Sequence, residues 1–145
     1  MRAPGLHRAD ATDAAALAEL LAQLGYPVAA AEVAARLQAM ADSPRHAVFI
    51  DLDEAGHARG FIGVEQRLMI ELGERAEITA LVVDSRLRRG GSGRRLLEAA
   101  RQWARAQGGS VVMVRSNIVR AESHPFYESQ GFVRRKTQHL YEAPL

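Results

Sequence analysis

Apolar residues near the start of the chain recur at the spacing of an α-helix. Leu17, Leu20 and Leu24 fall on one side of a predicted helix, which Gly25 ends. A second helix is predicted over about residues 29–41, where apolar side chains again lie three and four residues apart. This part of the chain is therefore predicted to be helical.

The pattern changes to that of strands after residue 45. β-rich runs occupy residues 46–52, 58–70 and 76–83, and the loop DEAGH, with the glycine and acidic residues of a hairpin turn, joins the first two. The segment GLHRAD, residues 5–10, predicts a short strand ahead of the helices. We therefore expect four strands within the first 83 residues.

Helices and strands alternate again in the remainder. A helix is predicted at about residues 91–107, a strand buried on both faces at 110–116 (SVVMVRS), and a short helix at 125–130. Residues 131–145 predict one or two final strands. The order β-α-α-β-β-β-α-β-α-β-β predicts an α/β fold built on a mixed sheet.

Composition narrows the class of protein. The length of 145 residues predicts a single domain over residues 1–145, and 48% hydrophobic with 25% charged residues is typical of a soluble globular protein. The absence of cysteine excludes disulfides, thiolate metal sites and a cysteine nucleophile. The N-terminal stretch lacks the long apolar run of a signal peptide or membrane span, so we expect a cytoplasmic protein without membrane contact.

Charge and histidine spacing argue against two further classes. The net charge is only +2 and the arginines are not interleaved with aromatic residues, so we expect no nucleic-acid partner. The five histidines are scattered without the spacing of metal ligands, so we expect no metal site.

The most unusual stretch is RLRRGGSGRRLL, residues 86–97, with five arginines and three glycines. A predicted strand runs into this loop, and the loop becomes a helix N-terminus, where unpaired N–H groups and the helix dipole favour an anion. Glycines let a phosphate approach the backbone, and the arginines add positive charge. The alternative is a surface loop whose arginines are merely solvated.

Two motifs, one in this stretch and one further along the chain, resemble those of one family. Arg88-x-x-Gly91-x-Gly93 is similar to the Q/R-x-x-G-x-G/A acyl-CoA loop of the GNAT (GCN5-related N-acetyltransferase) superfamily. SNIVRAESHPFYESQGF, residues 116–132, resembles the family's N-x-x-R-x-x-A-H-x-F-Y-E-x-x-G-F motif, with Ser123 where alanine is usual. The element order also fits, so the resemblance covers essentially the whole chain.

This resemblance implies a fold and a cosubstrate. The fold is a mixed, mostly antiparallel central sheet of about six to seven strands, splayed between strands 4 and 5 and flanked by about four helices. The cosubstrate is acetyl-CoA, whose pantetheine arm pairs with β-strand backbone in the splay and whose pyrophosphate lies on the loop amides. The residues implied to bind it are Leu81, Val82, Val83, Arg88, Arg89, Gly90, Gly91, Ser92, Gly93, Arg94, Asn117 and Tyr127.

Acetyl transfer to an amine requires an acid and a base. The leaving thiolate benefits from a proton donor, and Tyr127 stands at the position whose phenol faces the CoA sulfur in this family. The alternative for Tyr127 is a packed aromatic residue. His124, in the same motif, is expected to brace the loop before the last helix and to have no catalytic role.

The base is expected to be Glu77, in the strand AEITALVV. Strand alternation predicts Glu77, Thr79, Leu81 and Val83 on one face, in the cleft, where burial would raise the pKa of the carboxyl. The alternative is a solvated glutamate, with water accepting the proton of the amine.

Three functions remain open from the sequence. The preferred one is an acetyl-CoA-dependent N-acetyltransferase that acts on a primary amine of a small molecule. The alternatives are a protein N-terminal or lysine acetyltransferase and a non-catalytic CoA-binding module. Residues 137–145 (TQHLYEAPL) have an exposed-looking apolar edge that suggests a homodimer.

Overall fold

The computed structural model describes residues 2–87 and 90–145, in two compact units that divide after Val114. The first unit contains a five-stranded sheet, three α-helices and two short 3-10 helices. The second contains one short α-helix. The elements are β1 Gly5–Arg8, η1 Ala11–Asp13, α1 Ala14–Leu24, α2 Ala30–Ala41, β2 His46–Leu52, β3 Ala58–Met69, β4 Gly73–Val83, η2 Ser85–Leu87, α3 Ser92–Ala106, β5 Val112–Val114 and α4 Ser123–Ser129.

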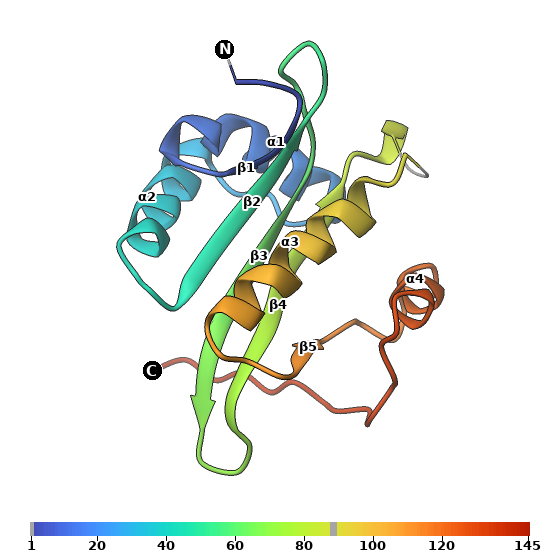
Figure 1. The fold of residues 1–145 in the computed structure, drawn as a ribbon. Helices are drawn as coiled ribbons and strands as arrows, with labels where there is room; N and C mark the ends of the chain where they lie inside the picture. Colours follow the sequence, from blue (N-terminus) through green and yellow to red (C-terminus); the bar gives the residue numbers. More distant parts are fainter. Residues whose placement is uncertain (1, 88–89) are drawn as a thin grey trace. The chain divides into compact units, whose positions relative to one another are not determined.

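The strands lie side by side in chain order, β1-β2-β3-β4-β5 (Figure 1). The first four are antiparallel to their neighbours, whereas β5 is parallel to β4 because α3 carries the chain back between them. The predicted hairpin between β2 and β3 is closed by Asp53, whose carboxylate accepts hydrogen bonds from the N–H groups of Ala55 and His57. The mixed, mostly antiparallel sheet is therefore confirmed.

Helices cover both faces of this sheet (Figure 1). On one face, Leu17 of α1 and Leu37 of α2 pack into a core with Ile50, Phe61 and Val82 of the strands. On the other face lies α3, whose apolar stripe is buried as the periodicity predicts. The buried residues of that stripe are Leu96, Leu97, Ala100 and Ala104. These two faces are called the α1/α2 face and the α3 face below.

A β-bulge interrupts the regular alternation of β4. Gly63 of β3 lies opposite Ala80, but the next residue, Val64, lies opposite Ile78, so Thr79 is an extra residue without a partner in this ladder. Paired residues of antiparallel strands point to the same face, and neighbours along β3 point to opposite faces. Ile78 and Ala80 therefore point to opposite faces, although they are two residues apart.

The bulge corrects the predicted shared face of Glu77, Thr79, Leu81 and Val83. Glu77 lies opposite Glu65, on the α1/α2 face, whereas Leu81 and Val83 lie opposite β3 residues of the α3 face. Simple alternation fails here because the extra residue rotates the strand by half a period. Glu77 and the residues predicted to bind pantetheine are thus on the same strand but on different faces.

The splay between β4 and β5 follows from the length of their pairing. Only Ala76, Glu77 and Ile78 of β4 pair with β5, and β4 continues for five more residues to Val83. The predicted buried strand at 110–116 is accordingly wrong in extent and burial, since β5 spans Val112–Val114 and is half-buried. β5 is short because a strand is defined by its hydrogen-bond ladder, and the ladder between β4 and β5 ends at the pair Ile78 and Val114.

The described residues form five strands rather than the predicted six to seven. Residues 132–145 have no helix or strand. An extended segment becomes a strand only where a neighbouring strand supplies hydrogen bonds, and apolar residues alone do not provide that partner.

The second unit forms its helix close to the predicted place. Pro125 lies in the first turn of α4, where its missing N–H costs nothing. Gly131, with a φ of 88°, ends the helix in the left-handed conformation, and the Phe132 N–H donates to the carbonyl of Tyr127. Within residues 2–87 and 90–145, no helix is long and apolar enough to cross a membrane.

Candidate active site

The glycine loop leads into α3 through a left-handed residue. Gly91 is the N-cap of α3 and has a φ of 81°, which a residue with a side chain adopts only with strain. No side chain of the described residues caps the helix, so the N–H groups of its first turn, from Ser92, Gly93 and Arg94, have no intrahelical partner. This is the geometry of an anion site. The predictions for Arg88 and Arg89 lie outside the described residues.

The other arginines of this stretch have different surroundings. Arg86 forms an ion pair of 2.8 Å with Asp84, and Arg95 forms one of 2.9 Å with Asp51. Arg94 is exposed, at the start of the helix. Arg86 and Arg95 therefore support the local structure, and Arg94 is the described arginine best suited to meet an anion.

A buried carboxylate that the sequence analysis missed lies beneath the loop. Asp51 of β2 has no exposed surface, and its Oδ2 accepts hydrogen bonds from Ser92 Oγ at 2.7 Å and from Arg95 Nη2 at 2.9 Å. The available signal was a lone acidic residue in the apolar run AVFIDL. It was missed because its partners are more than forty positions further along the chain.

Within the described part of the first unit, the edge of β4 beside this loop has no paired strand, and it is called the open edge below. Leu81, Val82 and Val83 pair with β3 on one side, and on the other side β5 has already ended. Val82 is buried in the α1/α2 core, while Leu81 and Val83 are half-buried. The strand thus offers its backbone to a further extended chain.

Glu77 is held in a network of charged side chains. Its Oε1 accepts a hydrogen bond of 2.9 Å from Arg67 Nη1, and Arg67 Nε lies 3.4 Å from Glu65 Oε1. His46 Nε2 lies 3.2 Å from the other oxygen of Glu65. The Glu77 side chain is 13% exposed, so it is a fixed, largely covered carboxylate and not a freely solvated one.

Tyr127, Asn117 and His124 belong to the second unit. The ring of Tyr127 makes edge-to-face contacts with Phe126 and Phe132, at centroid distances of 5.5 and 5.6 Å, and burial raises the pKa of its phenol. Asn117 Oδ1 accepts from the Val119 N–H, and the Asn117 carbonyl lies 3.2 Å from His124 Nε2. His124 thus contacts the turn before α4, as a bracing residue would.

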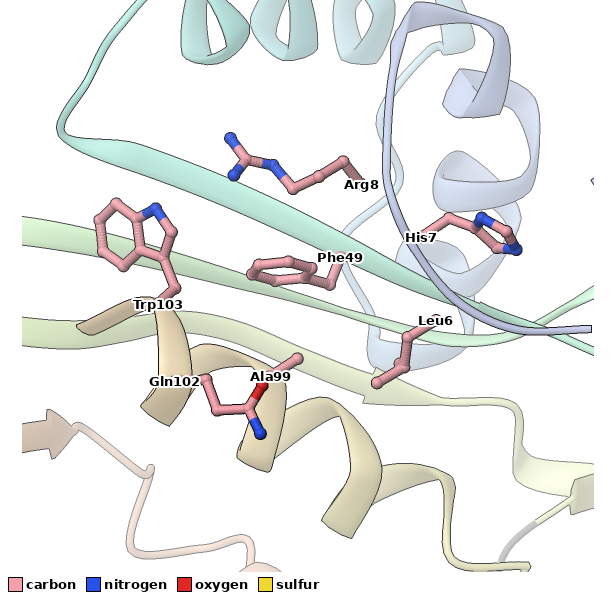
Figure 2. A pocket seen from close by; sticks show the side chains of 7 residues that line it. All are labelled: Leu6, His7, Arg8, Phe49, Ala99, Gln102 and Trp103. Atoms are coloured by element: carbon pink, nitrogen blue, oxygen red, sulfur yellow. The ribbon is translucent and has the colours of Figure 1, made fainter. Parts of the chain in front are cut away.

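Two depressions on the surface of the first unit lie away from the glycine loop. One, of about 390 Å³, lies between β1, β2 and the C-terminal half of α3, where the Arg8 guanidinium lies 5.4 Å from the centre of the Phe49 ring (Figure 2). The other, of about 440 Å³, is lined by His46, Glu65 and Arg67 of the charged network and by their neighbours. No cluster of three or more acidic or histidine side chains in the described chain is arranged to hold a metal ion.

Known proteins match this chain in sequence and in fold. The model of the acetyltransferase (GNAT) family matches residues 14–132. The uncharacterized N-acetyltransferase YhdJ of Bacillus subtilis (strain 168) is 34% identical over 98 residues, which are 67% of this chain and 68% of that protein.

Two solved structures illustrate the similarity in fold. AAC(6')-Iy in complex with a bisubstrate analogue, CoA-S-monomethyl-acetylneamine, has a TM-score of 0.85 at 17% identity and covers 97% of both chains. Glucosamine-6-phosphate N-acetyltransferase from Arabidopsis thaliana has a TM-score of 0.80 at 21% identity, over 97% of this chain and 99% of that one.

The chain therefore belongs to the GNAT acetyltransferase family, and its class is that of an acyltransferase. The resemblance read from the two motifs is confirmed, and acetyl-CoA is the acyl donor of this family. The roles of the individual residues remain predictions.

Proposed function

We propose that this protein transfers the acetyl group of acetyl-CoA to a primary amine of a small molecule, by direct attack of the amine on the thioester. The observation that carries the proposal is the open edge of β4 beside an uncapped helix N-terminus. Pairing with β5 ends at Ile78, while the left-handed Gly91 leaves the first N–H groups of α3 facing outward. An extended arm that ends in phosphates fits these two features together.

The residues predicted to bind the cofactor divide by chemistry. The backbone of Leu81, Val82 and Val83 would hydrogen-bond the amides of the pantetheine arm. The N–H groups of Gly91 to Arg94 would bind the pyrophosphate, supported by the positive end of the α3 dipole. Asn117 would orient the arm from the second unit, through its side-chain amide.

The acceptor amine would approach from the opposite side of β4. Glu77 lies on the α1/α2 face, whereas the glycine loop continues into α3 on the other face. Donor and acceptor would therefore meet across the open edge of one strand. This arrangement keeps the carboxylate of Glu77 away from the cofactor phosphates, which it would repel.

The transfer requires two proton movements. The amine nitrogen bonds to the thioester carbon and the carbon–sulfur bond breaks, so the sulfur leaves with the bonding electrons. Tyr127 would donate its phenolic proton to that sulfur, and burial, which raises the pKa of Tyr127, keeps the phenol protonated at neutral pH. Glu77, directly or through water, would accept the proton that the amine loses.

The small-molecule acceptor is supported by the names of similar proteins. One solved structure is a glucosamine-6-phosphate N-acetyltransferase, and another holds a bisubstrate analogue built from CoA and an acetylneamine. We infer the same acceptor class here, a soluble amine, from this analogy. A peptide N-terminus or lysine, or binding of CoA without transfer, would each be revealed by the following test.

The test measures binding first and transfer second. At a hundredfold excess over its dissociation constant, acetyl-CoA should stabilise the fold by about 2.7 kcal/mol and raise Tm by roughly 5–10 °C, whereas ATP and NAD should not. Thiol release would then be followed with panels of aminosugars and of short peptides. Binding without release from any amine would contradict catalysis, and release with peptides alone would contradict the small-molecule acceptor.

Tyr127→Phe tests the acid, with Tyr141→Phe as its matched control. Tyr141 is 86% exposed and has no proposed role. Tyr127→Phe should lower kcat about a hundredfold or more while leaving acetyl-CoA affinity nearly unchanged. Equal kcat values for the two variants would remove Tyr127 from the mechanism.

A further inference from the structure

Asp51 is a carboxylate enclosed between the sheet and the start of α3. It lies in β2, on the α3 face, and has no exposed surface. Burying a charge is costly unless it is paired and hydrogen-bonded, so this position demands an explanation. The explanation lies in the groups that Asp51 holds.

Among the described residues, the hydrogen-bond donors to the Asp51 carboxylate come from the beginning of α3. Ser92, 2% exposed, donates its hydroxyl to Asp51 Oδ2 at 2.7 Å, and Arg95 Nη2 donates to the same oxygen at 2.9 Å. Arg95 Nη1 reaches on to the carbonyl of Gly90 at 3.0 Å. One buried carboxylate thus fixes both sides of the left-handed Gly91, through Ser92 directly and through Arg95 to Gly90.

Gly60 lets the helix come close enough for these contacts. It lies opposite Asp51 in β3, and a Cβ there would be 2.5 Å from the Val82 carbonyl oxygen and 3.2 Å from Leu96 Cδ1. With no side chain at this position, Leu96 of α3 can pack close to β3, next to Asp51 in the neighbouring strand. The contact between strand and loop is therefore built into the packing of three elements.

The charge balance of the pair also affects an anion. A buried negative charge beneath the loop would repel phosphate, but Arg95 pairs with it directly and neutralises it. In turn, Asp51 holds the guanidinium of Arg95, whose side chain is 39% exposed, against the sheet. The Arg95 side chain thus donates one hydrogen bond to Asp51 and one to the Gly90 carbonyl, and these two bonds hold the turn in place.

We propose that Asp51 is a positioning residue for acetyl-CoA: through Ser92 and Arg95 it holds the Gly90–Ser92 turn in the shape that directs the N–H groups of α3 at the cofactor diphosphate. This inference rests on the proposed function for the identity of the ligand. It adds a residue of β2, outside both sequence motifs, to the determinants of cofactor affinity. Asp51 itself touches no reacting atom.

The first experiment measures the turn without any ligand. Hydrogen exchange of the amides at residues 90–95 should be faster in Asp51→Asn than in the parent, because the replaced carboxylate no longer pairs with Arg95. Ser92→Ala, which removes one hydrogen bond and keeps the ion pair, should show a smaller increase. The matched control is Asp13→Asn, since Asp13 is also a buried carboxylate, 5% exposed and paired with Arg2, in the distant η1 turn.

The second experiment compares two acetyl donors. Acetyl-CoA carries the diphosphate, whereas S-acetylpantetheine carries the same thioester arm without phosphates. Asp51→Asn should raise the KM for acetyl-CoA roughly tenfold with little change in kcat. The same variant should leave kcat/KM for S-acetylpantetheine within about twofold of the parent. Asp13→Asn should leave the kinetic constants for both donors close to those of the parent. A general loss of structure would affect both donors alike.

The outcomes separate this inference from the proposed function. Unchanged exchange at residues 90–95, or an equal loss with both donors, would overturn the role of Asp51 and leave the acetyltransferase proposal standing. A parent protein that does not bind acetyl-CoA would overturn both. If Asp51→Asn does not fold, the same two experiments on Ser92→Ala test the role of Asp51. Ser92→Ala should show a smaller rise in the KM for acetyl-CoA, again without a comparable change for S-acetylpantetheine.

Discussion

The turn that leads from β4 into the glycine loop depends on the carboxylate of Asp84. The effect of removing this carboxylate on the free energy of unfolding can be predicted quantitatively. Asp84 is 4% exposed, and its Oδ1 accepts hydrogen bonds from the backbone N–H and Nε of Arg86 at 2.9 and 3.1 Å. Its Oδ2 accepts from Arg86 Nη2 at 2.8 Å. These contacts lower the pKa of Asp84 from 3.8 to about 2, chiefly through the side chain of Arg86.

The magnitude follows from this lowered pKa. A folded state that binds the proton of Asp84 more weakly than the unfolded chain is stabilised above pH 3.8, and the stabilisation is lost as the pH falls through about 2. At 1.36 kcal/mol for each tenfold change in proton affinity, the upper value is about 2.4 kcal/mol. Because the Arg86 side chain is 75% exposed, water screens the pair, and we expect about 1–2 kcal/mol.

The assay is urea unfolding of the parent and Asp84→Asn at low ionic strength, in steps from pH 7 to pH 2. At neutral pH the variant should unfold with about 1–2 kcal/mol less free energy and a Tm lower by roughly 3–8 °C. The difference should shrink between pH 4 and pH 2, whereas Glu54→Gln in the exposed hairpin loop should show no such trend. Curves for the parent and Asp84→Asn that stay parallel throughout would refute the electrostatic reasoning.

Two further variants test the strands around the open edge. Glu77→Gln should lower kcat about a hundredfold and remove the acidic limb of the pH–rate profile. The control, Glu65→Gln, removes the other carboxylate that contacts Arg67 and should keep that limb. An unmoved profile in Glu77→Gln would mean that water, and not Glu77, accepts the proton of the amine. Gly60→Ala should lower the free energy of unfolding by about 1–3 kcal/mol, because its Cβ overlaps a backbone oxygen of β4; a Tm within about 1 °C of the parent would show that β4 moves aside freely.

Local patterns in the sequence predicted most of the helices and strands. The leucines of α1 lie at helical spacing, Gly25 ends that helix in the left-handed conformation, and Asp53 closes the predicted hairpin. Each of these signals acts within a few residues, so it can be read without knowing the fold. The final strands were wrong for the complementary reason, since a strand requires a partner that no local pattern supplies.

The site was predictable where a motif is contiguous and hidden where contacts span the chain. Gly91 could be recognised because a left-handed N-cap requires glycine, and its φ of 81° agrees. Arg67 and Asp51 were missed, because their bonds to Glu77 and Ser92 join different elements. For Asp51 the one sequence signal is an isolated charge in an apolar strand, and it does not reveal the partner.

The bulge at Thr79 links the position of Glu77 in β4 to the packing of the core of the first unit. If β4 kept all eleven residues but alternated strictly from Glu77, Val82 would turn from the core beneath α1 and α2 toward the α3 face. The loss of such a packed side chain from the core is costly, so the packing of Val82 favours the irregular strand. At this length of β4, the bulge is what allows Glu77 to lie beside Glu65 while Val82 stays in the core.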